Sequence, residues 1–110
     1  MIHLMKLSEP WYTLINKGKK TIELRLLDEK RSKIKKNDTI IFSDKNTTKS
    51  FKKKVKKLTY HKTFENALKH GKLKNIVPGI RTYKEAIKIY YDIPGYKSKE
   101  NDTGVVLIYL

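Results

Sequence analysis

The sequence predicts an α+β domain, built on a small curved sheet or barrel with two to three short helices at its side. Alternating apolar and polar residues indicate several short strands, and apolar residues at helical spacing indicate the helices. The chain has 110 residues, enough for one modest hydrophobic core and too few for two. We therefore expect residues 1–110 to form a single domain.

The first elements are a strand and a short helix. Ile2 and Leu4 suggest the strand, and Ser8 is placed to cap the helix that follows, with Pro10 in its first turn. Apolar residues then recur at helical spacing, at Trp11, Leu14 and Ile15. Gly18 is expected to end this helix. Trp11 is expected in the core, although a tryptophan beside a basic strand could also stack on a base.

Two further strands are expected in the middle of the chain, after a charged connection over residues 28–36. Residues 39–42, TIIF, form a continuous apolar run typical of a buried strand. Residues 51–60 should form the next strand, and the alternation slips before Leu58, which is compatible with a β-bulge. This strand carries the densest run of lysines. Such lysines either protect an edge strand from aggregation or follow a phosphate backbone.

The C-terminal half predicts two helices and a final strand. Thr63 opens the first helix and Gly71 closes it, while Thr82 and Glu85 have the spacing of a capping box at the start of the second. The second helix has an apolar stripe at Tyr83, Ala86, Ile87, Tyr90 and Tyr91. Residues 97–102, KSKEND, are expected to be a loop. The apolar run over residues 105–110 is expected to lie at the centre of the sheet.

The charge of the chain favours a polyanionic partner. Lys and Arg number 26 against 11 Asp and Glu, a formal net charge of +15, so nucleic acid is the first candidate. Arginine occurs only at Arg25, Arg31 and Arg81. Because specific phosphate recognition tends to use the planar arginine fork, we interpret most of this charge as non-specific attraction, with a lysine-rich composition as the alternative.

The sequence predicts no metal or cofactor. There is no cysteine, and His3, His61 and His70 have no metal-binding spacing. The N-terminus does not resemble a signal peptide, and no apolar run approaches membrane length. A soluble, cytoplasmic protein without a membrane partner is expected, and the sequence indicates no oligomeric state.

The candidate site lies within Lys17–Arg31, KGKKTIELRLLDEKR, which places four polar or flexible residues within eight positions: Gly18, Lys20, Glu23 and Arg25. Three aliphatic residues alternate with Glu23 and Arg25, so a strand here would bury the aliphatic face and present an acid and a base on the other. The pair could form the polar floor of a cleft. The alternative is an exposed ion pair that contributes about 0–1 kcal/mol.

Three segments together resemble the ASCH family, the activating-signal cointegrator homology domain: GKKTIELR, IKKNDTIIF and GVVLIYL. The resemblance is to small single-domain archaeal and bacterial members and covers essentially the whole chain. The GxKxxExR pattern alone is moderately specific, and its order relative to the other segments strengthens the assignment. The resemblance implies a PUA-like fold, a small β-barrel with helices at its side and a cleft lined by these residues. It also implies a link to RNA, because PUA-like domains commonly bind RNA or modified nucleotides.

The resemblance suggests two hydrolytic chemistries. In small ASCH amidohydrolases acting on N4-acetylcytidine, the proposed catalytic groups are a lysine matching Lys20, a threonine at the position of Glu23, and a later glutamate. The glutamate aligns near Pro78, and residues 66–84 contain no acid, so this set is only partly matched. In a metal-independent ribonuclease, Glu23 would be the base, and Lys20 and Arg25 would stabilise the phosphorane.

The sequence thus favours binding of RNA or a modified nucleotide. The expected binding residues are Gly18, Lys20, Glu23, Arg25, Tyr60 and Tyr91, with the tyrosines supplying stacking or a hydroxyl contact. Glu23 favours base recognition, because a carboxylate repels phosphate but accepts hydrogen bonds from an exocyclic amine. The alternative is a hydrolase of a nucleoside amide or of RNA phosphodiesters, with Lys20 and Glu23 as catalytic residues. A protein-interaction domain is a third hypothesis.

Overall fold

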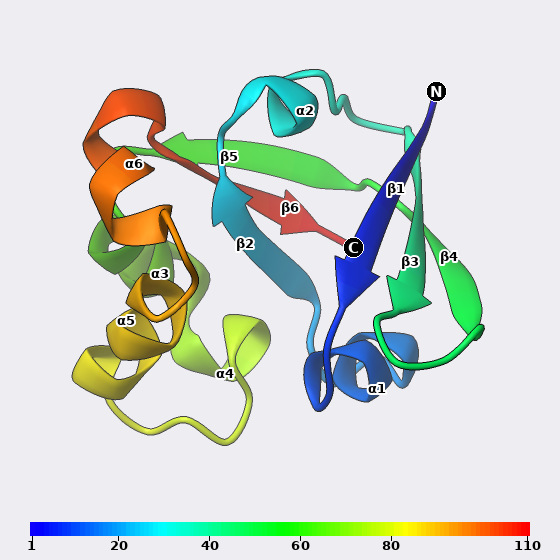
Figure 1. Cartoon of the computed structure of the whole chain (residues 1–110), viewed down its shortest axis with the longest axis horizontal. Helices are drawn as coiled ribbons and strands as arrows, with labels where there is room; N and C mark the ends of the chain where they lie inside the picture. Colours follow the sequence, from blue (N-terminus) through cyan, green and yellow to red (C-terminus); the bar gives the residue numbers. More distant parts are fainter.

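Two three-stranded sheets and six helices make up a mixed α+β domain, in a computed structural model that describes residues 1–110 (Figure 1). The first sheet has the order β1-β3-β4 and consists of β1 (Ile2–Leu7), β3 (Thr39–Asp44) and β4 (Ser50–Lys54). The second has the order β2-β6-β5 and consists of β2 (Ile22–Leu26), β6 (Val105–Tyr109) and β5 (Lys57–His61). Only the β1–β3 pairing is parallel.

The predicted α+β class is confirmed, but a closed barrel is not. β1 and β2 are each an edge strand of their own sheet, and no strand pairing joins them. The helices gather beside the second sheet, except that α1 lies below the gap between the sheets and α2 above it (Figure 1). No helix combines the length and the hydropathy needed to cross a bilayer.

Three of the six helices follow the prediction. These are α1 (Trp11–Asn16), α3 (Phe64–Gly71) and α5 (Tyr83–Tyr91). Thr63 and Thr82 cap α3 and α5 as expected, because their hydroxyls accept hydrogen bonds from the backbone amides of Asn66 and Glu85. The expected cap at Ser8 is wrong. The residue before α1 is Pro10, which makes no side-chain cap, and the carboxylate of Glu9 instead accepts from the Thr13 amide.

The other three helices were not predicted: α2 (Glu29–Ser32), α4 (Leu73–Ile76) and α6 (Tyr96–Thr103). The loop expected over residues 97–102 is therefore wrong. Helix α6 has no apolar stripe, and tertiary contacts hold it in place. The buried carboxylate of Glu100 accepts hydrogen bonds from the Phe64 amide and the Tyr91 hydroxyl, each at 2.7 Å, and the Tyr96 ring stacks on Phe64.

The single strand expected over residues 51–60 is two strands, β4 and β5, which belong to different sheets. Val55 is fully buried at the break, where its amide donates to Asp38 and its carbonyl accepts from Asn37. The slip in the apolar alternation therefore marks the point where the chain passes from one sheet to the other. It does not mark the expected β-bulge. The lysine run is divided between the two sheets.

Strand β6 separates two hydrophobic clusters, which confirms its predicted central position. Val105 and Leu107 pack on the helix side with α3 and α5, and Val106 and Ile108 pack on the side of the first sheet. Residues of strand β3 alternate between buried and half-buried at its start, so the expectation of a buried strand holds for one face only. Trp11 is partly buried against the helix-side cluster.

Candidate functional site

Strand β2 presents its polar side chains as its alternation predicts. Ile22, Leu24 and Leu26 enter the helix-side core, and Glu23 and Arg25 face away from it. Glu23 is only 4% exposed. Its Oε1 lies 3.2 Å from Lys20 Nζ, and its Oε2 accepts from Arg25 Nε at 2.9 Å. The exposed ion pair considered as an alternative is therefore excluded, and the three residues form a buried ion network.

The Lys20 ammonium uses all three of its donors inside the protein. It donates to the carbonyls of Ile22 at 2.6 Å and Ile76 at 2.5 Å, and its third acceptor is Glu23. Only the charged form has three donors, so these acceptors hold Lys20 as the ammonium. Burial lowers the pKa of Lys20, and the adjacent Glu23 carboxylate offsets part of this effect.

Arg25 is the member of the network with free hydrogen-bonding capacity. Its Nε donates to Glu23 and its Nη2 donates to the Lys6 carbonyl on β1 at 3.0 Å, so the side chain bridges the edge strands of the two sheets. Its Nη1 has no hydrogen-bond partner in the protein. Burial alone would lower the pKa of Arg25, but the Glu23 carboxylate outweighs it and raises the pKa.

The Glu23 carboxylate is held in its charged form. Burial alone would raise its pKa, but the Arg25 and Lys20 cations outweigh that effect and lower it. Both oxygens already serve these two cations. Glu23 therefore acts as the anionic link between them, and it is a weak proton acceptor in this arrangement.

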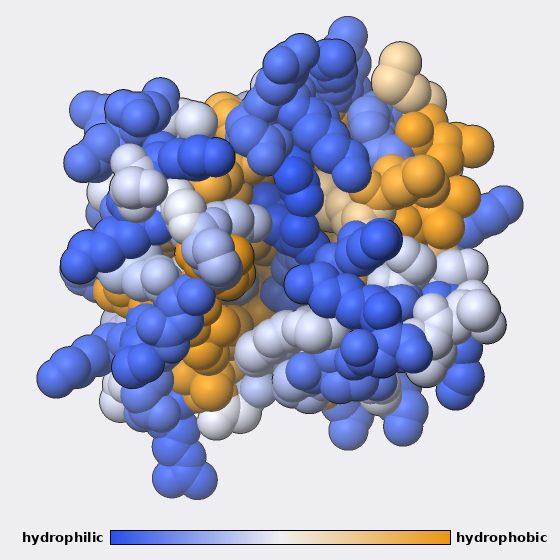
Figure 2. Space-filling model, viewed as in Figure 1, coloured by the Kyte–Doolittle hydropathy of each residue, from blue (hydrophilic) through white to orange (hydrophobic).

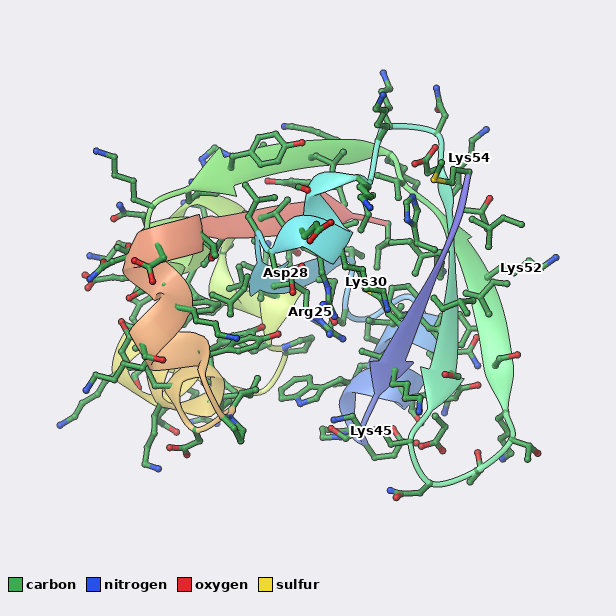
Figure 3. The ribbon with its side chains drawn as sticks, turned by 45° about the horizontal axis from the view of Figure 1, so that its top comes forward. Arg25, Asp28, Lys30, Lys45, Lys52 and Lys54 are labelled. Atoms are coloured by element: carbon green, nitrogen blue, oxygen red, sulfur yellow. The ribbon has the colours of Figure 1, made fainter.

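A cleft of about 990 Å³ opens between the two sheets above this network. Six cationic side chains line it: Lys6, Lys20, Arg25, Lys30, Arg31 and Lys45. Glu23 is the only acid among the lining residues. Figure 3 shows Arg25 and Lys30 in the space between the sheets and Lys45 at its lower end, and Figure 2 shows polar side chains in the central hollow. The cleft therefore suits an anionic ligand.

The cationic lining comes from five separate parts of the fold, which are β1, the connection between α1 and β2, β2, α2 and the connection between β3 and β4. Asp28 caps α2 and pairs with Arg31 Nη1 at 2.9 Å, so it neutralises that arginine. The Arg31 Nε is buried and has no hydrogen-bond partner. Lys6, Lys30 and Lys45 are exposed and form no ion pair with any carboxylate of the protein.

Aromatic side chains form part of the cleft wall. Trp11, Tyr90 and Tyr96 line it, and the Trp11 ring centroid lies 5.8 Å from Lys20 Nζ, within cation–π range. Burial and the nearby Glu23 carboxylate raise the pKa of Tyr90 well above its ordinary value, so its hydroxyl stays protonated. Trp11 and Tyr96 are partly exposed and offer apolar surface next to the cationic groups, whereas Tyr90 is only 6% exposed and stacks on Phe64.

The structure brings together Lys20, Glu23 and Arg25, as the sequence suggested, but not the other three candidates. Gly18 occupies the turn before β2 with a φ of +78° and does not line the cleft. Tyr60 is 58% exposed on β5, outside the cleft. Tyr91 also lies outside it, and its hydroxyl is bound to Glu100.

Sequence reasoning missed most of the cleft lining. Lys6, Lys45 and Tyr96 are brought to Arg25 only by the packing of the two sheets and α6, and Lys30 is presented by helix α2, which the sequence did not predict. No local pattern marks these residues, although the aromatic stripe of α5 contained Tyr90. No group of three or more His, Cys, Asp or Glu side chains is arranged to hold a metal ion.

Comparison with known proteins identifies the family. A family model of the ASCH domain matches residues 5–109. The chain belongs to the ASCH domain family. This ASCH domain is similar to hypothetical protein PH0355, known from a crystal structure, with 38% identity and a TM-score of 0.89 over 99% of this chain and 96% of that chain. It is also similar to protein PF0455 from Pyrococcus furiosus, solved by solution NMR, with 35% identity and a TM-score of 0.77 over 99% of this chain and 94% of that chain. No curated protein matches the chain.

Proposed function

We propose that this ASCH domain binds RNA or a modified nucleotide in the cleft between its two sheets, and that Arg25 is the main contact for the ligand. The observation that carries the proposal is the asymmetry of the ion network. Lys20 and Glu23 are occupied by partners within the protein, whereas Arg25 has a free Nη1 in the cleft wall. Glu23 and the Lys6 carbonyl hold the guanidinium plane in place, so little side-chain entropy is lost on binding.

The chemistry of the cleft supports a nucleotide. A planar guanidinium with free N–H groups recognises phosphate or a base edge, and Lys6, Lys30 and Lys45 add positive charge around it. The aromatic wall provides surface for a base. The volume of about 990 Å³ lies at the upper end of the usual range for small-molecule sites, about 300–1,000 Å³. The PUA-like fold that the family resemblance implies, and its link to RNA, point the same way.

The same contacts change the role first considered for Glu23. Base recognition by Glu23 would require free carboxylate oxygens, and both oxygens are engaged. We propose that Glu23 orients Arg25 and that Arg25 makes the contact. Hydrolysis of a nucleoside amide or of RNA phosphodiesters would require Lys20 or Glu23 to leave its partners before moving a proton. This requirement favours binding over hydrolysis.

The test is the affinity for short single-stranded RNA, measured against salt concentration for the wild type, Arg25→Gln and Arg25→Lys. Loss of a hydrogen bond to a charged group costs about 1.5–3 kcal/mol, so Arg25→Gln should weaken binding about ten- to a hundredfold. The slope of log affinity against log salt should fall by about 0.7 for each phosphate that the variant no longer neutralises. Arg25→Lys retains the charge but loses the planar guanidinium, so its affinity should lie between those of Arg25→Gln and the wild type.

The matched control is Lys84→Gln, which removes a charge from an exposed residue on α5 that does not line the cleft. Its affinity should stay close to that of the wild type, and circular dichroism confirms that each variant is folded. RNA binding that is absent in the wild type at low salt, or equal in Arg25→Gln and the control, would contradict the proposal. Acetate released from N4-acetylcytidine, or cleaved RNA, would replace it with the hydrolytic alternative.

A further inference from the structure

The outer face of the first sheet carries an ordered array of side chains, and only some of them line the cleft. Strand register places them in three rows across β1, β3 and β4. The rows are Ile2–Thr39–Lys54, Leu4–Ile41–Lys52 and Lys6–Ser43–Ser50. The face is therefore aliphatic on β1 and in the middle of β3, and cationic along its rim.

This face is open to solvent. Ile2 and Leu4 are each 61% exposed, whereas Met5 and Leu7, which point to the other side of β1, are buried in the core. A regular strand that keeps two large aliphatic residues exposed in this way is typical of a contact surface. Figure 2 shows apolar surface at the upper right, beside the central hollow.

The face is continuous with the cleft. Leu4, Lys6, Ile41, Ser43 and Ser50 belong to the outer rows and also line the cleft that contains Arg25. β1 is the edge strand of its sheet and contributes residues to both surfaces, so the cleft and the outer face adjoin along it. A flexible ligand bound at Arg25 can therefore extend onto this face.

The charge on the face indicates an anionic occupant. The three rows contain three lysines, Lys6, Lys52 and Lys54, and no acid. Figure 3 shows Lys52 and Lys54 on β4, which is the opposite edge of the sheet from β1. A second copy of this chain is disfavoured as the occupant, because its own net charge is +15 and lysines would meet lysines.

Resting on the proposed function, we infer that the ligand is single-stranded RNA and that its flanking nucleotides lie across the outer face of β1, β3 and β4. The unstacked bases make apolar contacts with Ile2, Leu4 and Ile41, and the phosphates approach Lys52 and Lys54. Duplex RNA does not fit this surface equally well, since its bases are stacked and cannot cover the aliphatic rows. A free nucleoside would leave the face unused.

The test measures affinity for oligouridylates of increasing length with four proteins. They are the wild type, Arg25→Gln, the outer-face variant Lys52→Glu/Lys54→Glu, and the control Lys62→Glu/Lys84→Glu, which has the same net charge but changes exposed lysines away from the cleft. Wild-type affinity should increase with length until the strand covers the face. The affinity of the outer-face variant should stop increasing at a shorter oligonucleotide length, and its final value should be about tenfold weaker than that of the wild type. The slope of its log affinity against log salt should be smaller by about 1.4.

A second variant, Ile2→Asn, separates the apolar contact from the charge at a residue that does not line the cleft. It should weaken the longer oligonucleotides while the salt slope stays the same, because the protein still neutralises the same number of phosphates. Ile2 is exposed, so the substitution leaves the core unchanged, and circular dichroism checks the fold directly.

The outcomes distinguish this inference from the proposed function. Outer-face and control variants of equal affinity at every length, with Arg25→Gln still weakened, would overturn the inference and leave the cleft proposal intact. Failure of every oligonucleotide to bind the wild type would overturn both. Equal binding of a duplex, or a dimer in solution that Ile2→Asn dissociates, would assign the face to a different occupant and overturn the inference.

Discussion

Lys20 Nζ and Glu23 Oε1 lie 3.2 Å apart, with both side chains no more than 5% exposed. Removing one member of a buried ion pair costs about 3–5 kcal/mol, because the partner charge remains buried. Glu23→Gln should lower the free energy of unfolding by that amount in urea denaturation. The control is Glu65→Gln, which breaks an exposed pair with Lys69 and should have a much smaller effect. Equal losses for the two variants would show that Glu23 is not the anionic centre of the network.

Asp38 should make the stability of the protein depend on pH in the acid range. Its carboxylate accepts hydrogen bonds from His3 Nε2 at 2.8 Å, from the Lys35 amide and from the N-terminus, and these lower its pKa from 3.8 to about 2. A group with a lowered folded-state pKa stabilises the fold above its unfolded pKa and loses that contribution as the pH falls. Stability should therefore decline between about pH 4 and about pH 2.

The measurement is the midpoint of urea unfolding across that pH window. In the Asp38→Asn variant, stability should decline less over this pH window, because the contribution of Asp38 is absent. Asp102→Asn is the matched control, because this exposed side chain makes no hydrogen bond or ion pair in the protein. If the acid decline of Asp38→Asn matched that of the control, the hydrogen bonds to Asp38 would not be its source.

Gly71 should not tolerate alanine, although it ends a helix. A Cβ atom there would lie 2.8 Å from Ile76 Cδ1 and 3.1 Å from Leu107 Cδ1. Such overpacking costs about 1–3 kcal/mol, more than the gain of about 0.5–1 kcal/mol from replacing a helical glycine.

Ile76→Val provides the rescue for this prediction, since it removes the Cδ1 atom that the new Cβ would meet. The double variant Gly71→Ala/Ile76→Val should be more stable than the sum of the two single effects predicts. Thermal unfolding of the four proteins measures this coupling. Additive effects would indicate that the contact with Ile76 is not what excludes alanine.

Tyr91→Phe should affect stability and leave RNA affinity unchanged. The Tyr91 hydroxyl donates to Glu100 at 2.7 Å, which raises the pKa of Tyr91 to about 12, and the residue does not line the cleft. Losing this hydrogen bond should cost about 1 kcal/mol in urea denaturation. A clear loss of RNA affinity in a folded Tyr91→Phe protein would return Tyr91 to the binding residues that the sequence suggested.

Much of the fold could be predicted because its signals are local. Thr63 and Thr82 cap their helices through contacts with residues three positions away, and the alternation of β2 separates Glu23 from its aliphatic neighbours. Helix α6 could not be predicted in this way. It has no apolar stripe, and Glu100 holds it through partners on α3 and α5. The change of sheet at Val55 produced only a slip in the pattern, which a bulge would also produce.

The sequence by itself determined the family, the α+β class and the central position of β6. It also determined that Lys20, Glu23 and Arg25 lie near one another, because the strand period and their short spacing are set within a few residues. Only the tertiary structure decided what these three residues do. The Ile76 carbonyl that binds Lys20 is 56 residues away, and the Lys6 carbonyl that binds Arg25 is on another sheet. Burial and hydrogen-bond partners decide whether a charge is occupied or free for a ligand, and both arise from contacts between distant segments.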